Sequence, residues 1–262
     1  MSIDGQRLTR LLAGDGRSPG ERERLVRLMQ LLAELRLPPD PHALLPRYAE
    51  LKARFVEAAA GEDGEVLEQR FLELYCHLHG HEAPYSAEER CRVTESGGYW
   101  CHAGGLSPIL KAGDHIEPDT VSCDFGAGNG LQTLLMQALY PHRKTVQIEI
   151  SSRMVEAGRA LQDWLGIPTG RVEWVVGDVL ERGSPAGMDF VYLYRPVRPE
   201  GEGRQFYERF GAALARKERP VVIFSIADCL KPFLPPGFER FYFDGHLACY
   251  RRARGGRRST AS

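Results

Sequence analysis

The second half of the chain alternates between strand-like and helix-like segments, and this alternation constrains the fold more than any other feature. From residue 119 onwards, short β-branched and aromatic runs alternate with longer segments whose apolar residues recur at helical spacing. Strands are expected at 121–124, 144–150, 172–176, 190–194 and 220–227, and helices at 130–139, 152–165 and 205–216. Alternating β and α units of this length predict a parallel sheet with helices on both faces.

The alternation ends with two adjacent β runs, 238–243 and 247–251, that have no helix between them. Such a pair is typical of an antiparallel hairpin. The prediction is therefore an α/β fold with a seven-stranded, mostly parallel, doubly wound sheet that closes with an antiparallel strand pair. The last residues, 253–262, are rich in arginine and lack an apolar anchor, so we expect a disordered basic tail.

Residues 1–95 differ in composition and are rich in Leu, Arg, Glu and Ala. Their apolar residues recur at helical spacing in 25–35, 51–56 and 66–75. We expect three or four amphipathic helices there, the first beginning near Ser18 and ended by the prolines at 38 and 39. Residues 96–118 contain glycines and aromatic residues and are predicted to be a loop and linker, either a packed interdomain linker or a lid over a site. A domain with the parallel sheet then occupies residues 119–252.

The charge balance and the hydropathy pattern exclude several classes of protein. Lys and Arg number 34 and Asp and Glu number 35, so the net charge of -1 lacks the electrostatics of a general nucleic-acid binder. No apolar run approaches the roughly 20 residues that span a bilayer, and the N-terminus lacks the apolar core of a secretory signal. We expect a cytoplasmic protein with no membrane partner.

The strongest chemical signal is the run 124–130, Asp-Phe-Gly-Ala-Gly-Asn-Gly, which joins the first predicted strand of the sheet to the next helix. Glycines at alternate positions let a ligand approach the backbone closely, and the following helix directs its N-terminal amides at the same place. Glu149 follows Gly126 by 23 residues, at the end of the next predicted strand. This is the position of a carboxylate that binds a ribose diol.

Two cofactor classes compete for this turn. A dinucleotide site requires G-x-G-x-x-G, but Leu131 occupies the position of its third glycine. The pattern D-x-G-x-G-x-G instead resembles the first motif of class I S-adenosylmethionine-dependent methyltransferases. Three further segments, 146–150, 175–179 and 189–194, resemble the later motifs of that family in the same order, over roughly residues 100–250.

The resemblance implies S-adenosylmethionine as cofactor, S-adenosylhomocysteine as product, and a set of binding residues. Asp124 would orient the turn and the methionine ammonium group, because a carboxylate suits a cation. Gly126, Ala127 and Gly128 would line the methionine part, where glycine leaves room. Glu149 would accept hydrogen bonds from both ribose hydroxyls.

The resemblance also assigns the adenine side and the end of the fourth strand. Ile150 would pack on the adenine face, while Asp178, with Val179 beside it, would accept a hydrogen bond from the adenine amine. Tyr194 would lie beside the transferred methyl group. The alternatives are that Asp178 only caps a turn and that Ile150 is an ordinary core residue.

The acceptor side departs from the patterns of well-known methyltransferases. Residues 194–197, Tyr-Arg-Pro-Val, replace the [DNS]-P-P-[YF] of enzymes that methylate adenine or glutamine, so those acceptors are disfavoured. The catalytic candidates are Tyr194, Arg195, Tyr99 and His102. Arg195 would hold an anionic group, unless it forms a salt bridge to a neighbouring helix.

Three functions therefore stay open at this point. The leading one is methyl transfer to a small molecule or a protein side chain, with RNA ranked third because of the near-neutral charge. The second is an NAD(P)-binding oxidoreductase with a Rossmann fold. The third is an inactive methyltransferase fold that acts only as a binding module. The oligomeric state is left open.

The N-terminal region and the glycine loop are expected to build the acceptor pocket. Tyr99 is expected over the cofactor, because its hydroxyl needs a polar partner, and Trp100 in the core. Deleting residues 1–90 is expected to abolish turnover and leave cofactor affinity unchanged.

A histidine cluster at residues 77–81 raises the possibility of a metal site. His77, His79 and His81 alternate, with Gly80 breaking the helix that would bring ligands onto one face. We therefore predict solvated histidines at a helix end and no bound metal. The other potential ligands are Cys91, Cys101 and His102.

Overall fold

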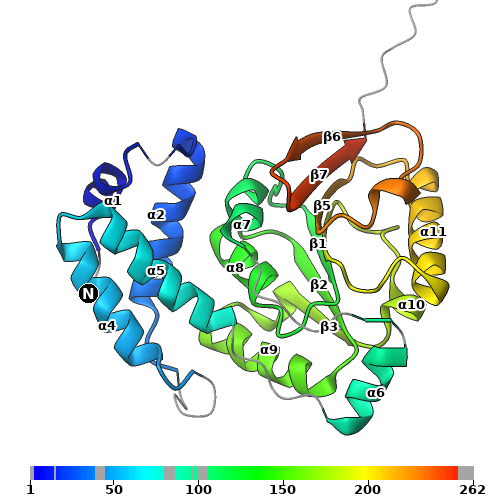
Figure 1. Ribbon diagram of the computed structural model, residues 1–262, viewed down its shortest axis with the longest axis horizontal. Coiled ribbons are helices and arrows are strands. Elements are labelled where there is room, and N and C mark those ends of the chain that lie inside the picture. Colours follow the sequence, from blue (N-terminus) through cyan, green and yellow to red (C-terminus); the bar gives the residue numbers. More distant parts are fainter. Residues whose placement is uncertain are drawn as a thin grey trace, which may run out of the picture.

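A seven-stranded sheet forms the centre of the computed structural model, which describes residues 3–14, 16–38, 45–79, 86–95, 97–98 and 105–252 (Figure 1). The strand order is β3-β2-β1-β4-β5-β7-β6. The strands are β1 (Val121–Phe125), β2 (Lys144–Glu149), β3 (Val172–Val176), β4 (Phe190–Tyr194), β5 (Val222–Ile226), β6 (Phe238–Phe243) and β7 (Leu247–Arg252). The first five pair in parallel, while β7 is antiparallel to both β5 and β6. This confirms the predicted fold class.

Helices follow most of the parallel strands, as expected of βα units. They are α8 (Leu131–Leu139), α9 (Ser152–Trp164), α10 (Val179–Arg182) and α11 (Gly201–Arg216), with short 3-10 turns η1 (Thr169–Arg171) and η2 (Lys231–Phe233). The sequence did not predict α10, a single turn too short to show helical periodicity. Helix α11 begins four residues before the predicted 205, because its first turn is polar and glycine-rich.

The described N-terminal region is helical, as predicted, with α1 (Gly5–Leu11), α2 (Pro19–Glu34), α4 (Tyr48–Ala60), α5 (Gly64–His79) and α6 (Ala87–Glu95). Ser18 caps α2 by accepting a hydrogen bond from the N–H of Glu21, which confirms the predicted start of that helix. Helix α2 ends at Glu34, before the prolines that were expected to end it.

One helix contradicts the prediction of a loop and linker over 96–118. Helix α7 (Leu106–Ala112) begins directly after Gly105 and buries Ile109 and Leu110 in the core. The glycines and aromatic rings that suggested a loop lie upstream, and Pro108 is compatible with the first helical turn. The loop prediction is therefore wrong for the second part of this segment.

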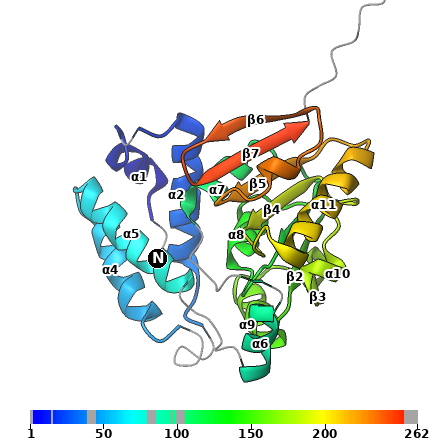
Figure 2. The same ribbon diagram turned by 45° about the vertical axis from the view of Figure 1, so that its right-hand side comes forward.

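The N-terminal helices share a continuous hydrophobic core with one face of the sheet. Buried side chains of α2, α4 and α5 belong to the same cluster as those of α7, α8 and β4. In Figure 2, α2 stands between the other N-terminal helices and α7 and α8. Polar contacts cross this boundary, including Lys111 Nζ to Glu21 (2.7 Å) and Trp164 Nε1 to the carbonyl of Arg36 (2.9 Å). Deleting residues 1–90 would expose this core, so we no longer expect the truncated chain to keep its cofactor affinity.

No helix in the described ranges is both long and apolar enough to cross a membrane. The tail 253–262, predicted to be disordered, lies outside the described residues.

Candidate functional site

The turn between β1 and α8 requires glycine at three alternate positions. Gly126, Gly128 and Gly130 have φ angles of +79°, +58° and +68°, a region that other residues rarely adopt. A Cβ atom on Gly130 would also lie 2.6 Å from the Gln147 amide nitrogen and from the Trp174 ring. The turn therefore needs glycine for its conformation and, at Gly130, for space against β2 and β3.

Hydrogen bonds tie this turn to the end of β2. The N–H groups of Gly126 and Ala127 donate to the carbonyl of Ile148 at 2.9 and 3.0 Å. The N–H of Gly128 donates to Glu149 Oε2 at 2.8 Å. The carboxyl end of β2 thus positions the turn.

Glu149 lies beneath the turn as a buried carboxylate, 4% exposed. Its second oxygen, Oε1, accepts the N–H of Ser151 at 2.9 Å. Burial raises the pKa of Glu149 and Glu89 adds to this, although the N–H groups of Ser151, Gly128 and Ile150 oppose it. Each carboxylate oxygen has two lone pairs, so the group can accept further hydrogen bonds from a diol.

Asp124 is 2% exposed and lies in β1 under the start of α8. It accepts a hydrogen bond from Thr133 Oγ1 at 3.1 Å. Burial raises its pKa to about 7, opposed by the Thr133 hydrogen bond and assisted by the nearby Glu149. A cation brought near this carboxyl group would favour its charged form.

Apolar and polar groups lie together at the end of β3. Val176 pairs with Glu149 across the sheet and is 50% exposed. Ile150 is half-buried beside it. Asp178 Oδ1 accepts the N–H of Leu180 at 2.8 Å and caps α10, as the capping alternative requires. Val179, the first residue of α10, is buried in the core.

The ends of β4 and β5 carry backbone strain. Arg195 and Ala227 have φ angles of +40° and +50°, the described non-glycine residues in the left-handed region. They follow Tyr194 and Ile226, which pair across the sheet. Strain of this kind costs of order 1–3 kcal/mol per residue and clusters at functional sites.

The catalytic candidate Tyr194 is half-buried at this edge, and Arg195 lies near Cys229. Burial raises the pKa of the Cys229 thiol, and the charge of Arg195 opposes this. A Cβ on Gly126 would lie 3.0 Å from Pro196, so the glycine turn and the end of β4 are in close proximity.

Sequence reasoning missed two side chains at this edge, His246 and Asp228. The His246 ring lies edge-on to Tyr194, with ring centroids 5.9 Å apart, and its carbonyl accepts the N–H of Ala227 at 2.9 Å. Asp228 accepts a hydrogen bond from the Tyr250 hydroxyl, while its buried Oδ1 has no partner within the described part of the chain. Asp228 could have been found from its place just beyond a strand end; His246 had no signal.

Tyr99, Trp100 and His102 lie outside the described residues, so their predicted roles stay predictions. The chain on either side of them is anchored at the carboxyl edge of the sheet. Gly98 forms a β-bridge with Val197, beyond the end of β4. On the other side, the Gly105 carbonyl accepts a hydrogen bond from Gln132 Nε2 in the first turn of α8, at 2.9 Å.

The histidines at the end of α5 are not simply solvated. His79 is 7% exposed, its ring lies 4.5 Å from that of Tyr75, and burial lowers its pKa to about 4. The prediction of a solvated helix end is wrong for His79, because the last turn of α5 packs into the core. Within the described ranges, no three His, Cys, Asp or Glu side chains gather as a metal site; His81 lies outside them.

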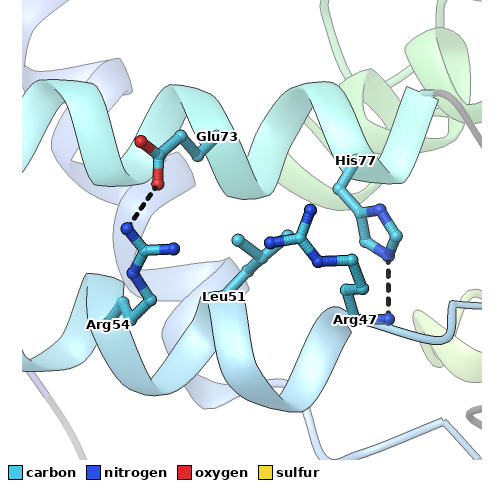
Figure 3. Close-up of a pocket in the computed structure, with 5 residues that line it drawn as sticks. All are labelled: Arg47, Leu51, Arg54, Glu73 and His77. Atoms are coloured by element: carbon cyan, nitrogen blue, oxygen red, sulfur yellow. Dashed lines mark hydrogen bonds and ion pairs between the residues drawn. The ribbon is translucent and has the colours of Figure 1, made fainter.

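A hollow of about 440 Å³ lies between α4 and α5, lined by Arg47, Leu51, Arg54, Glu73 and His77 (Figure 3). Its charges are neutralised locally: Arg54 and Glu73 are 3.5 Å apart, and Arg47 and Arg54 both pair with Glu50. The hollow lies on the N-terminal helices and shares no lining residue with the edge of the sheet, so we do not assign the site to it.

No protein-family model matches this sequence, and no curated protein matches it. Among solved structures, an RNA methyltransferase from Salinibacter ruber in complex with S-adenosyl-L-homocysteine is 21% identical, covering 55% of this chain and 86% of that one, with a TM-score of 0.42. A putative RNA methyltransferase from Pyrococcus horikoshii is 18% identical, covering 57% and 83%, with a TM-score of 0.41. A putative methyltransferase from Escherichia coli is 15% identical, covering 65% and 88%, with a TM-score of 0.41.

Proposed function

We propose that this protein binds S-adenosylmethionine at the ends of β1, β2 and β3 and transfers its methyl group to an acceptor at the ends of β4 and β5. The observation that carries the proposal is the buried carboxylate of Glu149, held at the end of β2 against a turn with three left-handed glycines. The sheet order, with its antiparallel closing pair, is the architecture that the resemblance to class I methyltransferases implies.

The residues present fit the cofactor group by group. Glu149 offers lone pairs to the ribose hydroxyls, and the exposed Val176 and half-buried Ile150 offer apolar surface to the adenine ring. Asp178 uses Oδ1 as a helix cap, which leaves Oδ2 as acceptor for the adenine amine. The pKa of Asp124 is raised, and a nearby ammonium group would stabilise the charged form of this carboxyl group.

The rival dinucleotide site finds less support in the same contacts. Leu131 is the first residue of α8 and is buried in the core, where a dinucleotide fingerprint has a glycine. The glycine that allows close packing against Gln147 and Trp174 is instead Gly130, one residue earlier. The other alternative, an inactive binding module, would keep the same glycine turn as an active methyltransferase. It would differ from the active enzyme only at the acceptor side.

At the acceptor side, the proposed roles follow from chemistry. When bound, the sulfonium group supplies an electrophilic methyl carbon, which bonds to an acceptor lone pair as the bond to sulfur breaks and S-adenosylhomocysteine is left. Arg195 would hold an anionic part of the acceptor, while Tyr194 would orient the attacking atom. A proton on the acceptor would pass to a base, for which Asp228 is a candidate.

The acceptor candidates are a small molecule, a protein side chain and RNA. RNA was ranked third because the net charge is -1, but a net charge averages over the whole chain. Arg240 on β6 and Arg251 and Arg252 on β7 lie over phenylalanine rings at 4.4–5.6 Å, and Arg251 also pairs with Glu239. We therefore keep RNA as an acceptor equal in rank to the other two.

Isothermal titration with S-adenosylhomocysteine and, separately, NAD⁺ tests the proposal. We expect binding of S-adenosylhomocysteine only, and at least a tenfold loss of affinity in Glu149→Ala, since hydrogen bonds to a charged group contribute about 1.5–3 kcal/mol. Glu156→Ala, on the exposed side of α9, is the matched control and should bind like the wild type. Binding of NAD⁺ alone, or of neither ligand at millimolar concentration, would contradict the proposal.

A further inference from the structure

Helix α6 comes from the N-terminal region but lies at the carboxyl end of the sheet. Figure 1 shows it apart from α1, α2, α4 and α5 and next to α9. It is a mostly polar helix, yet one of its acids, Glu89, is only 4% exposed. Glu89 Oε1 accepts the hydroxyl hydrogen bond of Ser151 at 2.7 Å, and Oε2 accepts the N–H of Ser86 at 2.7 Å.

Ser151 connects this acid to the proposed ribose carboxylate. Its backbone N–H donates to Glu149 Oε1 at 2.9 Å while its hydroxyl donates to Glu89. The same hydroxyl accepts the N–H of Met154 and caps α9. A single serine therefore lies between two buried carboxylates, one from the N-terminal region and one from the sheet.

The bond to Ser151 goes beyond the capping box that Glu89 forms with Ser86 at the start of α6. Burial opposes ionisation of Glu89, but the hydrogen bonds from Ser86 and Ser151 outweigh it and lower its pKa. The charge of Glu89 in turn raises the pKa of Glu149. The carboxylate of Glu89 is therefore held in its ionised form beside Ser151, where its charge acts on Glu149.

The chain after α6 is anchored on the other side of the glycine turn. Gly98 bridges to Val197, and the N–H of Arg198 donates to the Gly97 carbonyl at 2.9 Å. In the sheet, β1 lies between β2 and β4. The two anchors, at the end of β2 and beyond the end of β4, therefore lie on opposite sides of the turn that follows β1.

We propose that α6 forms the outer wall of the cofactor site and that Glu89 is a positioning residue, which holds Ser151 and through it the carboxylate of Glu149. This rests on the proposed function and adds to it a binding element from the N-terminal region, whereas the cofactor contacts predicted from the sequence, apart from Tyr99, all lie after 119. It also makes cofactor affinity sensitive to changes in α6.

Titration of S-adenosylhomocysteine into the full-length protein tests this role. We expect Glu89→Ala to weaken affinity about five- to tenfold, because Ser151 loses its anchor. Glu89→Gln keeps an acceptor for the Ser151 hydroxyl and should bind within about twofold of the wild type at pH 8. Glu88→Ala, at an exposed position of the same helix, is the matched control and should have no effect.

The pH profile of affinity separates this role from simple packing. Binding requires ionised Glu149, so affinity should fall as the pH drops through the raised pKa of that acid. The acids that act on Glu149 are Glu89 from α6 and Asp124 from β1. Glu89→Gln removes one negative charge near Glu149, which lowers the pKa of Glu149. The pH at which affinity falls should therefore be lower in this variant than in the wild type.

The outcomes distinguish the two proposals. If the wild type binds S-adenosylhomocysteine but Glu89→Ala binds equally well, the role of Glu89 is overturned and the proposed function stands. An unshifted pH profile in Glu89→Gln, the variant expected to stay folded, overturns it as well. If the wild type does not bind the ligand, both proposals fail.

Discussion

The two halves of the carboxyl edge hold their backbone in opposite ways. After β1, each left-handed position is a glycine: Gly126, Gly128 and Gly130. After β4 and β5, the left-handed positions are Arg195 and Ala227, whose side chains make that conformation costly. The same local geometry is thus reached without strain in one half and with strain in the other.

Polar groups follow the same division. In the first half, both oxygens of Glu149 and one oxygen of Asp124 already have hydrogen-bond partners. In the second half, Asp228 has a buried oxygen without a partner within the described residues. A pre-formed first half suits the proposed cofactor site, whereas the unpartnered oxygen of Asp228 and the backbone strain in the second half suit the proposed acceptor site.

The largest expected effect is on the glycine turn itself. Gly130→Ala should lower the free energy of unfolding by about 3 kcal/mol or more, because it adds left-handed strain and a clash with Gln147 and Trp174. Gly166 has a similar φ of +69°, but a Cβ added there would meet open space. Gly166→Ala should therefore lower the free energy of unfolding by only about 1 kcal/mol. Urea unfolding of both variants gives the comparison; equal losses would show that space at Gly130 is not limiting.

Asp124→Asn should stabilise the cofactor-free protein at pH 8 by about 1–3 kcal/mol. The folded-state pKa is about 7, above the ordinary 3.8, so the wild type loses stability as the pH rises from about 4 to 7. The asparagine variant does not titrate, and its advantage should therefore shrink as the pH is lowered to 5. Thermal unfolding at pH 5 and pH 8 measures this; a pH-independent difference would contradict the raised pKa.

The smallest effect should come from relieving strain at the end of β5. Ala227→Gly removes only a methyl group and permits a φ of +50°, so the protein should gain about 0.5–1 kcal/mol. Ala212→Gly, at an exposed position within α11, should lose about 1 kcal/mol for lack of helix propensity. Changes of opposite sign in the free energy of unfolding, measured by chemical unfolding, would confirm the strain at Ala227. A loss of stability in both variants would argue against it.

The sheet and the first half of the edge could be predicted from sequence because their signals are local. Strands 172–176, 190–194 and 238–243 were predicted with the bounds observed, since each is a short apolar run between turn residues. Gly126 and Glu149 likewise follow or end two consecutive strands of the βα pattern, so both lie at the carboxyl edge of the sheet. The hydrogen bond from the N–H of Gly128 to Glu149 is consistent with this placement.

The rest could not be predicted, because it depends on long-range packing. Glu89 is 62 residues from Ser151 and looks like any other acid on a polar helix. His79 is buried by tertiary contacts, although its neighbours in sequence suggested a solvated end. His246 meets Tyr194 at the end of β4 because β7 folds back antiparallel to β5.

The most direct test of this account is a crystal structure of the protein with S-adenosylhomocysteine. We predict that the ribose hydroxyls lie within hydrogen-bond distance of Glu149, the adenine lies beside Val176, and the sulfur points to Tyr194 and Arg195. The adenosine part would then occupy the unstrained half of the edge and the reacting atom would face the strained half. Ligand bound in the hollow between α4 and α5, or with its sulfur turned away from β4, would contradict the account.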